Sequence, residues 1–194
     1  GRTVTFAEPP ERIVIAGRAL LMVADAVYLF PEATEKVAAI EKITQGAANF
    51  IPLVDPWYGE KTVLPVGVGA EGIAAVRPDL VLLKSYMRNK LGKPLENLGI
   101  RVVYLNFESP ADYLREIAML GKIMGSTSRS SEIQRFYRKR LELVATEVGD
   151  LPRARRPAVL FLSYTQKGGA VSFNVPPGTW LQTALIERAG GKPV

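Results

Sequence analysis

Residues 71–105, with the sequence EGIAAVRPDLVLLKSYMRNKLGKPLENLGIRVVYL, decide the fold. Two apolar runs in this stretch, at 79–83 and 101–105, are rich in the aliphatic residues that favour buried strands. Residues 91–98 between them have a helical pattern, and Gly99 stands where glycine commonly ends a helix. A strand, a helix and a second strand in this order predict a βαβ unit with parallel strands.

The alternation of strands and helices extends toward the amino terminus. Residues 12–16 and 36–40 predict two further strands, and residues 19–29 predict a helix between them. Residues 41–62 show no clear period, so we interpret them as a long loop, which is usually functional or disordered. These patterns predict one α/β lobe over residues 1–127, in which the four predicted strands all run parallel.

Two long helices are predicted next. The first opens with Ser109 as its N-cap and Pro110 at its first helical position. The second covers residues 128–148 and would be about 31 Å long at ~1.5 Å per residue. From its pattern alone, the second helix either packs on the same sheet or connects two lobes.

The rest of the chain predicts a small second lobe over residues 149–194. Two prolines and three arginines within 149–157 indicate a boundary. Beyond it, the pattern predicts strands at 158–163 and 170–175 and a helix at 179–189. A parallel layer of this size cannot bury both of its faces, so we expect the second lobe to be truncated.

Composition excludes several kinds of site. The chain has no histidine and no cysteine, which excludes imidazole zinc sites, histidine general bases, disulfides and thiolate metal sites within these residues. The formal net charge is +6, which fits either a basic surface or the attraction of an anionic ligand. The basic residues are spread along the chain without a nucleic-acid recognition motif, so we expect no nucleic-acid partner.

One motif points to an alternative function. Gly67, Gly69 and Gly72 match the spacing of a dinucleotide fingerprint, but Pro65 interrupts the lead-in and Pro78 cuts the following helix short. The alternative reading is a doubly wound α/β enzyme that binds a nucleotide or a nucleotide-sugar. An interaction or sensor module is a further alternative. No paired carboxylates, nucleophile elbow or phosphate-binding loop is found, so we expect neither catalysis nor a required cofactor.

Ligands of open α/β sheets bind beyond the carboxyl ends of the strands. The loops that follow the predicted strands carry aromatic and cationic side chains, which suit a bulky, partly anionic, planar or catechol-like ligand. The candidate ligand-binding residues are Arg18, Trp57, Tyr58, Lys84, Tyr86, Arg88, Glu108 and, in the second lobe, Tyr164.

Short motifs along nearly the whole chain carry a family resemblance. They are GR-V at 1–4 with PP-RIV at 9–14, G---E-IAA-RPDLV at 67–81, LGI-VV at 98–103, LGK--G at 120–125 and AGG at 189–191. In this order they resemble the solute-binding proteins of bacterial ABC importers for siderophores, cobalamin and metals.

This resemblance implies a fold and a partner. The fold would be two Rossmann-like α/β lobes that clasp the ligand between them: an amino-terminal lobe over 1–127, an interdomain helix over 128–148 and the start of a second lobe over 149–194. The partner would be the importer's permease, which the family docks through one acidic residue per lobe. Glu71 falls on the first-lobe docking position.

The resemblance also implies a location and a ligand. The protein would be periplasmic or extracellular, in contact with the membrane only through the permease or a lipid anchor outside this segment. Family members that bind bare zinc or manganese usually rely on histidine, which is absent here. The expected ligand is therefore an iron chelate: a ferric siderophore, haem or a corrinoid. Directly bound ferric ion, for which Tyr, Asp and Glu would be the ligands, and an oxyanion such as molybdate are the remaining alternatives.

Overall fold

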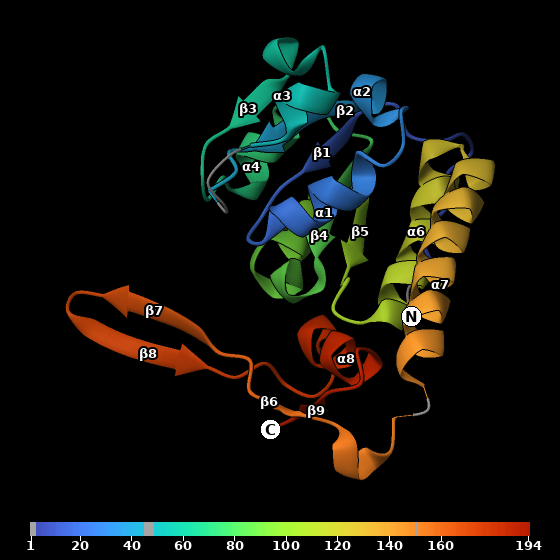
Figure 1. Cartoon of the computed structure of the whole chain (residues 1–194). Helices are drawn as coiled ribbons and strands as arrows, with labels where there is room; N and C mark the ends of the chain where they lie inside the picture. Colours follow the sequence, from blue (N-terminus) through green and yellow to red (C-terminus); the bar gives the residue numbers. More distant parts are fainter. Residues whose placement is uncertain (1–2, 45–48, 150) are drawn as a thin grey trace. The chain divides into compact units, whose positions relative to one another are not determined.

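The computed structural model describes residues 3–44, 49–149 and 151–194 (Figure 1). Internal contacts divide the chain into two compact units. The first unit contains the chain up to Phe107 together with Arg115–Ser131. The second contains Glu108–Leu114 and Glu132–Val194.

A five-stranded sheet forms the centre of the first unit, with all strands parallel and in the order β3-β2-β1-β4-β5. The strands are β1 (Ile13–Ile15), β2 (Val37–Glu41), β3 (Thr62–Leu64), β4 (Leu80–Lys84) and β5 (Val102–Leu105). The four parallel strands predicted from the sequence are confirmed.

The prediction of an unstructured loop over residues 41–62 is wrong in part, because the segment contains α3 (Ile51–Val54) and η1 (Tyr58–Glu60) and its last residue begins β3. The strand has only three residues, of which two are exposed, so it leaves no apolar pattern in the sequence. It lies at the edge of the sheet, paired with β2 alone. Residues 45–48 of the predicted loop lie outside the described residues.

The helices of the first unit cover both faces of the sheet. Their bounds are α1 (Leu20–Val27), α2 (Ala33–Lys36), α3 (Ile51–Val54), η1 (Tyr58–Glu60), α4 (Ala70–Ala74), η2 (Ser85–Met87), η3 (Arg88–Gly92) and α5 (Lys93–Asn97). On one face, Ile73 of α4 and Leu95 of α5 pack with strand residues such as Val81. The pleat turns Leu80 and Leu82 to the opposite face, and both are completely buried. Cover on both faces explains why the strands are continuous apolar runs.

Two long helices, α6 (Pro110–Met124) and α7 (Thr127–Val148), contribute residues to both units. Within the first unit, a Cβ at Gly121 of α6 would overlap Ser130 of α7. Within the second, Nε2 of Gln134 on α7 donates to the carbonyl oxygen of Leu114 on α6 at 2.9 Å. The predicted helix start at Pro110 is confirmed, and α7 begins one residue before its predicted start. The role of 128–148 as an interdomain helix stays a prediction.

The second unit contains two small sheets and a helix. β6 (Ala158–Val159) pairs in parallel with β9 (Lys192–Pro193), while β7 (Ser163–Lys167) and β8 (Ala170–Asn174) form an antiparallel hairpin. The other elements are η4 (Arg153–Arg155) and α8 (Leu181–Arg188). The single strand predicted over 158–163 is wrong. Its first two residues are β6, and the strand that follows, β7, was missed because its sequence SYTQK is largely polar.

Candidate functional site

The carboxyl edge of the parallel sheet is where the sequence predicts ligand binding. From β1 the chain proceeds outward to β2 and β3, whereas β4 lies on the other side of β1 and is followed outward by β5. Open α/β sheets bind ligands where the strand order reverses in this way. Arg18 follows β1 and Tyr86 follows β4, so the loops that carry these two candidates flank that position.

A buried carboxylate that the sequence did not reveal organises this edge. Glu41, the last residue of β2, is only 5% exposed. Its Oε2 accepts a hydrogen bond from the N–H of Gly17 at 2.6 Å, and its Oε1 accepts one from the N–H of Gly67 at 2.7 Å. Such short, charge-assisted bonds are stronger than neutral ones. Glu41 therefore fixes the loops that follow β1 and β3 relative to each other.

The glycine before Arg18 is required by two constraints. Gly17 has a φ of +86°, in the left-handed region that favours glycine. A Cβ at this position would also lie 3.2 Å from Cγ of Met87. The loop therefore approaches η2 closely, and the next side chain, Arg18, is exposed at the edge.

A hollow of about 470 Å³ opens beside Glu41. A second hollow, of about 210 Å³, shares Gly17, Arg18, Glu41 and Val66 with the first. The first hollow is lined by Gly17, Arg18, Glu41, Val66, Gly67, Val68, Gly69, Ala70, Met87, Lys90, Leu91 and Pro94. Of the candidates predicted from the sequence, it contains Arg18 alone.

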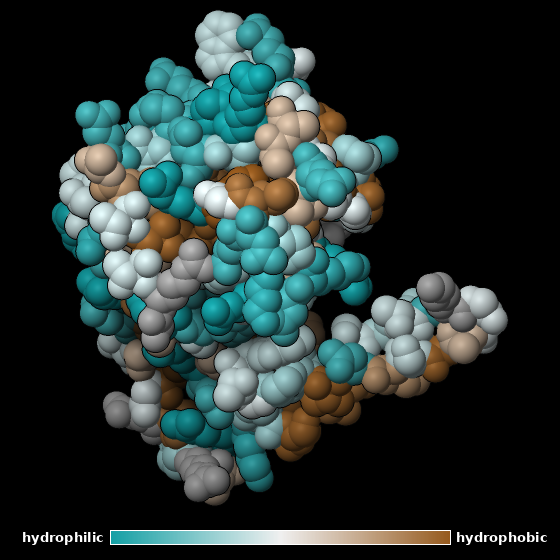
Figure 2. Space-filling view, turned by 180° about the vertical axis from the view of Figure 1, so that it is seen from behind, coloured by the Kyte–Doolittle hydropathy of each residue, from teal (hydrophilic) through white to brown (hydrophobic). Residues whose placement is uncertain are grey.

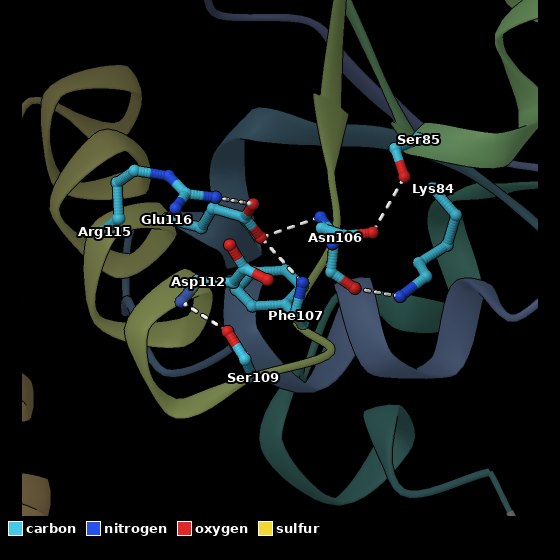
Figure 3. A network of polar contacts seen from close by, with 8 residues as sticks. All are labelled: Lys84, Ser85, Asn106, Phe107, Ser109, Asp112, Arg115 and Glu116. Carbon is cyan, nitrogen blue, oxygen red and sulfur yellow. Dashed lines mark hydrogen bonds and ion pairs between the residues drawn. The ribbon is translucent and has the colours of Figure 1, made fainter. Parts of the chain in front are cut away.

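A second buried carboxylate, Glu116 of α6, fixes the loop after β5 (Figure 3). Its Oε2 accepts hydrogen bonds from the N–H groups of Asn106 and Phe107, both at 2.8 Å. Phe107 is buried and has a φ of +51°, a strained backbone for a residue with a bulky side chain. The bonds from Glu116 help to hold this backbone in place. Glu108, a predicted ligand contact, follows directly and is half-buried.

Lys84 also holds the loop after β5 in place. The sequence predicts that Lys84 contacts a ligand, but the side chain is completely buried and its Nζ donates to the carbonyl oxygen of Asn106. That carbonyl and the N–H of Phe107 belong to one peptide group, which therefore has a cation at one end and the Glu116 carboxylate at the other. Figure 3 shows this arrangement, together with the 2.8 Å bond from Ser85 Oγ to Asn106 Oδ1. Lys84 thus has a supporting position and presents no surface to a ligand.

The predicted residues Trp57 and Tyr58 belong to a different part of the first unit. Neither lines the hollow around Arg18. Their segment is fixed by the buried Asp55, which accepts hydrogen bonds from the Tyr28 hydroxyl at 2.9 Å and from the Trp57 N–H at 3.0 Å and pairs with Lys61 at 3.3 Å. Burial raises the pKa of the Tyr28 hydroxyl, and the neighbouring Asp55 charge raises it further. Trp57 is fixed through its backbone while its side chain stays largely exposed.

Tyr86 and Arg88 lie in the helical segment after β4. Tyr86 is more than half exposed, and the Arg88 guanidinium carbon lies 5.7 Å from the ring centre of Tyr104. The Tyr104 hydroxyl donates to Oε1 of Glu96 at 2.7 Å. A π-helical turn, Arg88–Gly92, follows Tyr86, and such turns frequently occur at functional sites.

The two remaining candidates are exposed side chains. Tyr164 belongs to β7 of the second unit, where its ring centre lies 6.5 Å from that of Phe173. Glu71 is exposed in the first turn of α4. Among the described residues, no group of three or more His, Cys, Asp and Glu side chains is arranged to hold a metal ion. In the same part of the chain, no helix is both long enough and apolar enough to cross a membrane.

A family profile described as "Periplasmic binding protein" matches residues 19–192. The chain belongs to this family. The match begins after β1 and includes β2 to β5 of the first unit and most of the second unit. No curated protein matches the sequence.

Solved structures of periplasmic binding proteins share the fold. An ABC transporter substrate-binding protein from Listeria monocytogenes is 20% identical, with a TM-score of 0.68 over 96% of this chain and 64% of its own. S. aureus IsdE complexed with heme is 17% identical, with a TM-score of 0.70 over 94% and 64%. The TroA-like protein FepB from Veillonella parvula is 21% identical, with a TM-score of 0.74 over 100% and 59%. The chain thus spans about 60% of the length of these relatives.

Family membership decides several expectations from the sequence. The α/β periplasmic binding protein fold is confirmed. The family consists of extracytoplasmic substrate-binding proteins and not of enzymes, so the nucleotide-dependent enzyme is not favoured. What such proteins carry is a transported ligand and not a resident cofactor.

Proposed function

We propose that this chain is the ligand-binding part of an extracytoplasmic solute-binding protein of an ABC importer, which captures an iron chelate and delivers it to the permease. The observation that carries this proposal is the family match over residues 19–192. The candidate chelates are a ferric siderophore, haem and a corrinoid. IsdE, which shares the fold, was solved with heme, and FepB is another relative of the same fold.

The carboxyl edge of the first unit supports this class of ligand. Arg18, Tyr86 and Arg88 place cationic and aromatic side chains on the loops beside the reversal of strand order. Aromatic faces and guanidinium groups both suit a large chelate with π-electrons and acidic oxygens. Glu108, Trp57, Tyr58 and Tyr164 are further proposed contacts.

The glycine motif lacks two features of a dinucleotide site. In a dinucleotide site, backbone N–H groups of the glycine loop face the pyrophosphate. Here the N–H of Gly67 already donates to Oε1 of Glu41 at 2.7 Å, so it is not available to a pyrophosphate. The helix that follows, α4, has only five residues, so it offers little of the dipole that such sites use.

The test is native mass spectrometry of the whole protein as isolated from its source, combined with metal analysis. We expect a bound species that contains iron together with the mass of an organic chelator or a porphyrin. Replacing Tyr86 and Arg88 together should weaken rebinding of the released species. A nucleotide in place of a chelate would contradict the proposal and support the enzyme alternative.

Glu71 is the proposed contact with the permease from this unit. It is exposed and stands in the first turn of α4, and its carboxylate has no hydrogen-bond or ion-pair partner in the described parts of the chain. A free carboxylate on a short surface helix is available to pair with an arginine of a docking partner.

A further inference from the structure

The hollows beside Glu41 are lined by three cationic side chains. Arg18 and Lys90 line the larger hollow, and Arg18 and Lys42 line the smaller one. All three are exposed, and no hydrogen bond or ion pair engages their side chains within the described parts of the chain. By contrast, Lys36 pairs with Glu11 and Lys61 pairs with Asp55 in the same unit.

Among the described residues, Glu41 is the only acidic one that lines these hollows, and both of its oxygens are already engaged. They accept from the N–H groups of Gly17 and Gly67 at 2.6 and 2.7 Å. Three cationic side chains and one carboxylate give these hollows a formal net charge of about +2. Like charges gathered in one concave place raise the local potential and attract an anion.

The three cations come from separate loops. Arg18 follows β1, Lys42 follows β2 and Lys90 lies on the π-helical turn after β4. The loops that carry Arg18 and Lys42 are linked by a hydrogen bond. The N–H of Gly17, next to Arg18, donates to Oε2 of Glu41, which directly precedes Lys42. A guanidinium held in this way can bind two acidic oxygens side by side, and an ammonium adds a point charge.

We propose that these hollows bind the acidic oxygens of an anionic iron chelate, such as a catecholate or carboxylate siderophore or the carboxylates of haem, and disfavour neutral chelates. This inference rests on the proposed function and narrows it. Arg18 and Lys90 bind the acidic oxygens, Lys42 adds to the positive potential, and Glu41 positions the loop that carries Arg18.

The experiment compares two ferric chelates that share octahedral oxygen coordination but differ in charge. One is a synthetic hexadentate ferric tris-catecholate, which is triply negative, and the other is a cyclic ferric tris-hydroxamate, which is neutral. Haemin and its dimethyl ester form a second pair, which distinguishes a porphyrin source of the acidic groups. Binding to the whole protein is measured by titration calorimetry at low and high salt.

The variants are Arg18→Gln and Lys90→Gln, each with a matched control at the opposite end of the unit. Arg101→Gln is the control for arginine, since Arg101 precedes β5 and lies at the amino edge of the sheet. Lys122→Gln is the control for lysine, since Lys122 borders the pocket formed with Phe6 and Pro9 near the start of the chain. Neither control residue lines the hollows beside Glu41.

We expect the wild-type protein to bind an anionic member of at least one pair about tenfold or more tightly than its neutral counterpart. Arg18→Gln should reduce that affinity about ten- to a hundredfold, Lys90→Gln should reduce it less, and the controls should leave it unchanged. High salt should remove most of the preference, because the cations are exposed. Equal or tighter binding of both neutral chelates would overturn the inference while the proposed function stands. Binding of none of the four compounds would overturn both.

Discussion

The two units differ in how far they bury apolar runs of similar composition. In the first unit, the run IVIA at 13–16 is completely buried between helices. In the second, the run LFL at 160–162 follows β6 and is about half exposed at each residue. The hairpin β7–β8 is exposed as well, with Tyr164 and Phe173 both 68% accessible. Figure 2 shows hydrophobic residues at the surface along this hairpin and at its base.

This difference shows that the burial of an apolar run depends on the elements that surround it as well as on its composition. β1 has a parallel partner on each side, and helices cover both faces of its sheet. β7 has a single partner, and a lone two-stranded hairpin cannot bury either face. The apolar run at 13–16 therefore contains a buried strand, whereas the run at 160–162 forms neither a strand nor a core.

The largest effect is expected from removing a side chain at the centre of the first sheet. Leu82 on β4 is completely buried, so Leu82→Ala should lower the free energy of unfolding by about 2–5 kcal/mol. The counterpart in the second unit is Leu160→Ala, which should change it by about 0.5 kcal/mol or less, because Leu160 is already half exposed. Urea denaturation of the whole protein, followed by circular dichroism, measures both. Equal effects would show that the exposed run is covered in solution.

The two units can also be compared through a polar group in each, starting with the buried carboxylate of Glu116 in the first unit. Glu116→Ala would remove the carboxylate oxygen that accepts from the N–H groups of Asn106 and Phe107. We expect a loss of about 2–4 kcal/mol of unfolding free energy.

The control is Ser172→Ala in the second unit, which removes the exposed 2.8 Å contact with the Thr165 hydroxyl. It should cost about 0.5 kcal/mol or less, because water replaces an exposed partner. Glu116→Gln keeps one acceptor oxygen and should fall between the two. If Glu116→Ala is as mild as the control, the carboxylate does not fix the loop after β5.

Glycines with positive φ offer a third, smaller contrast. Gly17 has a φ of +86° and is crowded by Met87, whereas Gly168 in the β7–β8 turn has a φ of +58° and open space around it. Gly17→Ala should cost about 1–3 kcal/mol, and Gly168→Ala about 1 kcal/mol. Thermal denaturation of the two variants measures the difference. An equal cost would mean that crowding at Gly17 relaxes without strain.

The sequence predicts the apolar part of the fold well and the polar supports of the site poorly. Four strands of the main sheet are continuous aliphatic runs, which a single chain reveals directly. Glu41 and Glu116 cannot be recognised in this way, because their partners are backbone N–H groups, which carry no residue-specific signal. Lys84 looks like a surface residue at a strand end, and only the fold shows that its ammonium lies inside. The hairpin did leave a signal, since two glycines at 168–169 favour a two-residue turn.

Substitution of Glu71 tests the proposed contact with the permease, and it is expected to change stability the least. A carboxylate in the first turn of a helix is stabilised by about 0.3–1 kcal/mol, and less is expected from the five residues of α4. Glu71→Ala should therefore leave both unfolding and chelate affinity nearly unchanged. A docked carboxylate paired with a permease arginine is desolvated, and truncating such a pair typically costs about 2–5 kcal/mol of binding. Glu71→Ala should accordingly reduce permease-dependent uptake sharply.

The matched control is Glu60→Ala, which removes another exposed acid of the same unit. Glu71→Gln preserves the shape of the side chain and loses its charge, so it should impair uptake almost as much as Glu71→Ala, while Glu60→Ala should not. Uptake of labelled chelate into vesicles that contain the permease, at saturating binding protein and then at limiting binding protein, separates weak docking from slow transport, because weak docking is overcome at high concentration. Normal uptake with both Glu71 variants at limiting concentration would leave Glu71 only its local role at the start of α4, and the docking assignment would be wrong.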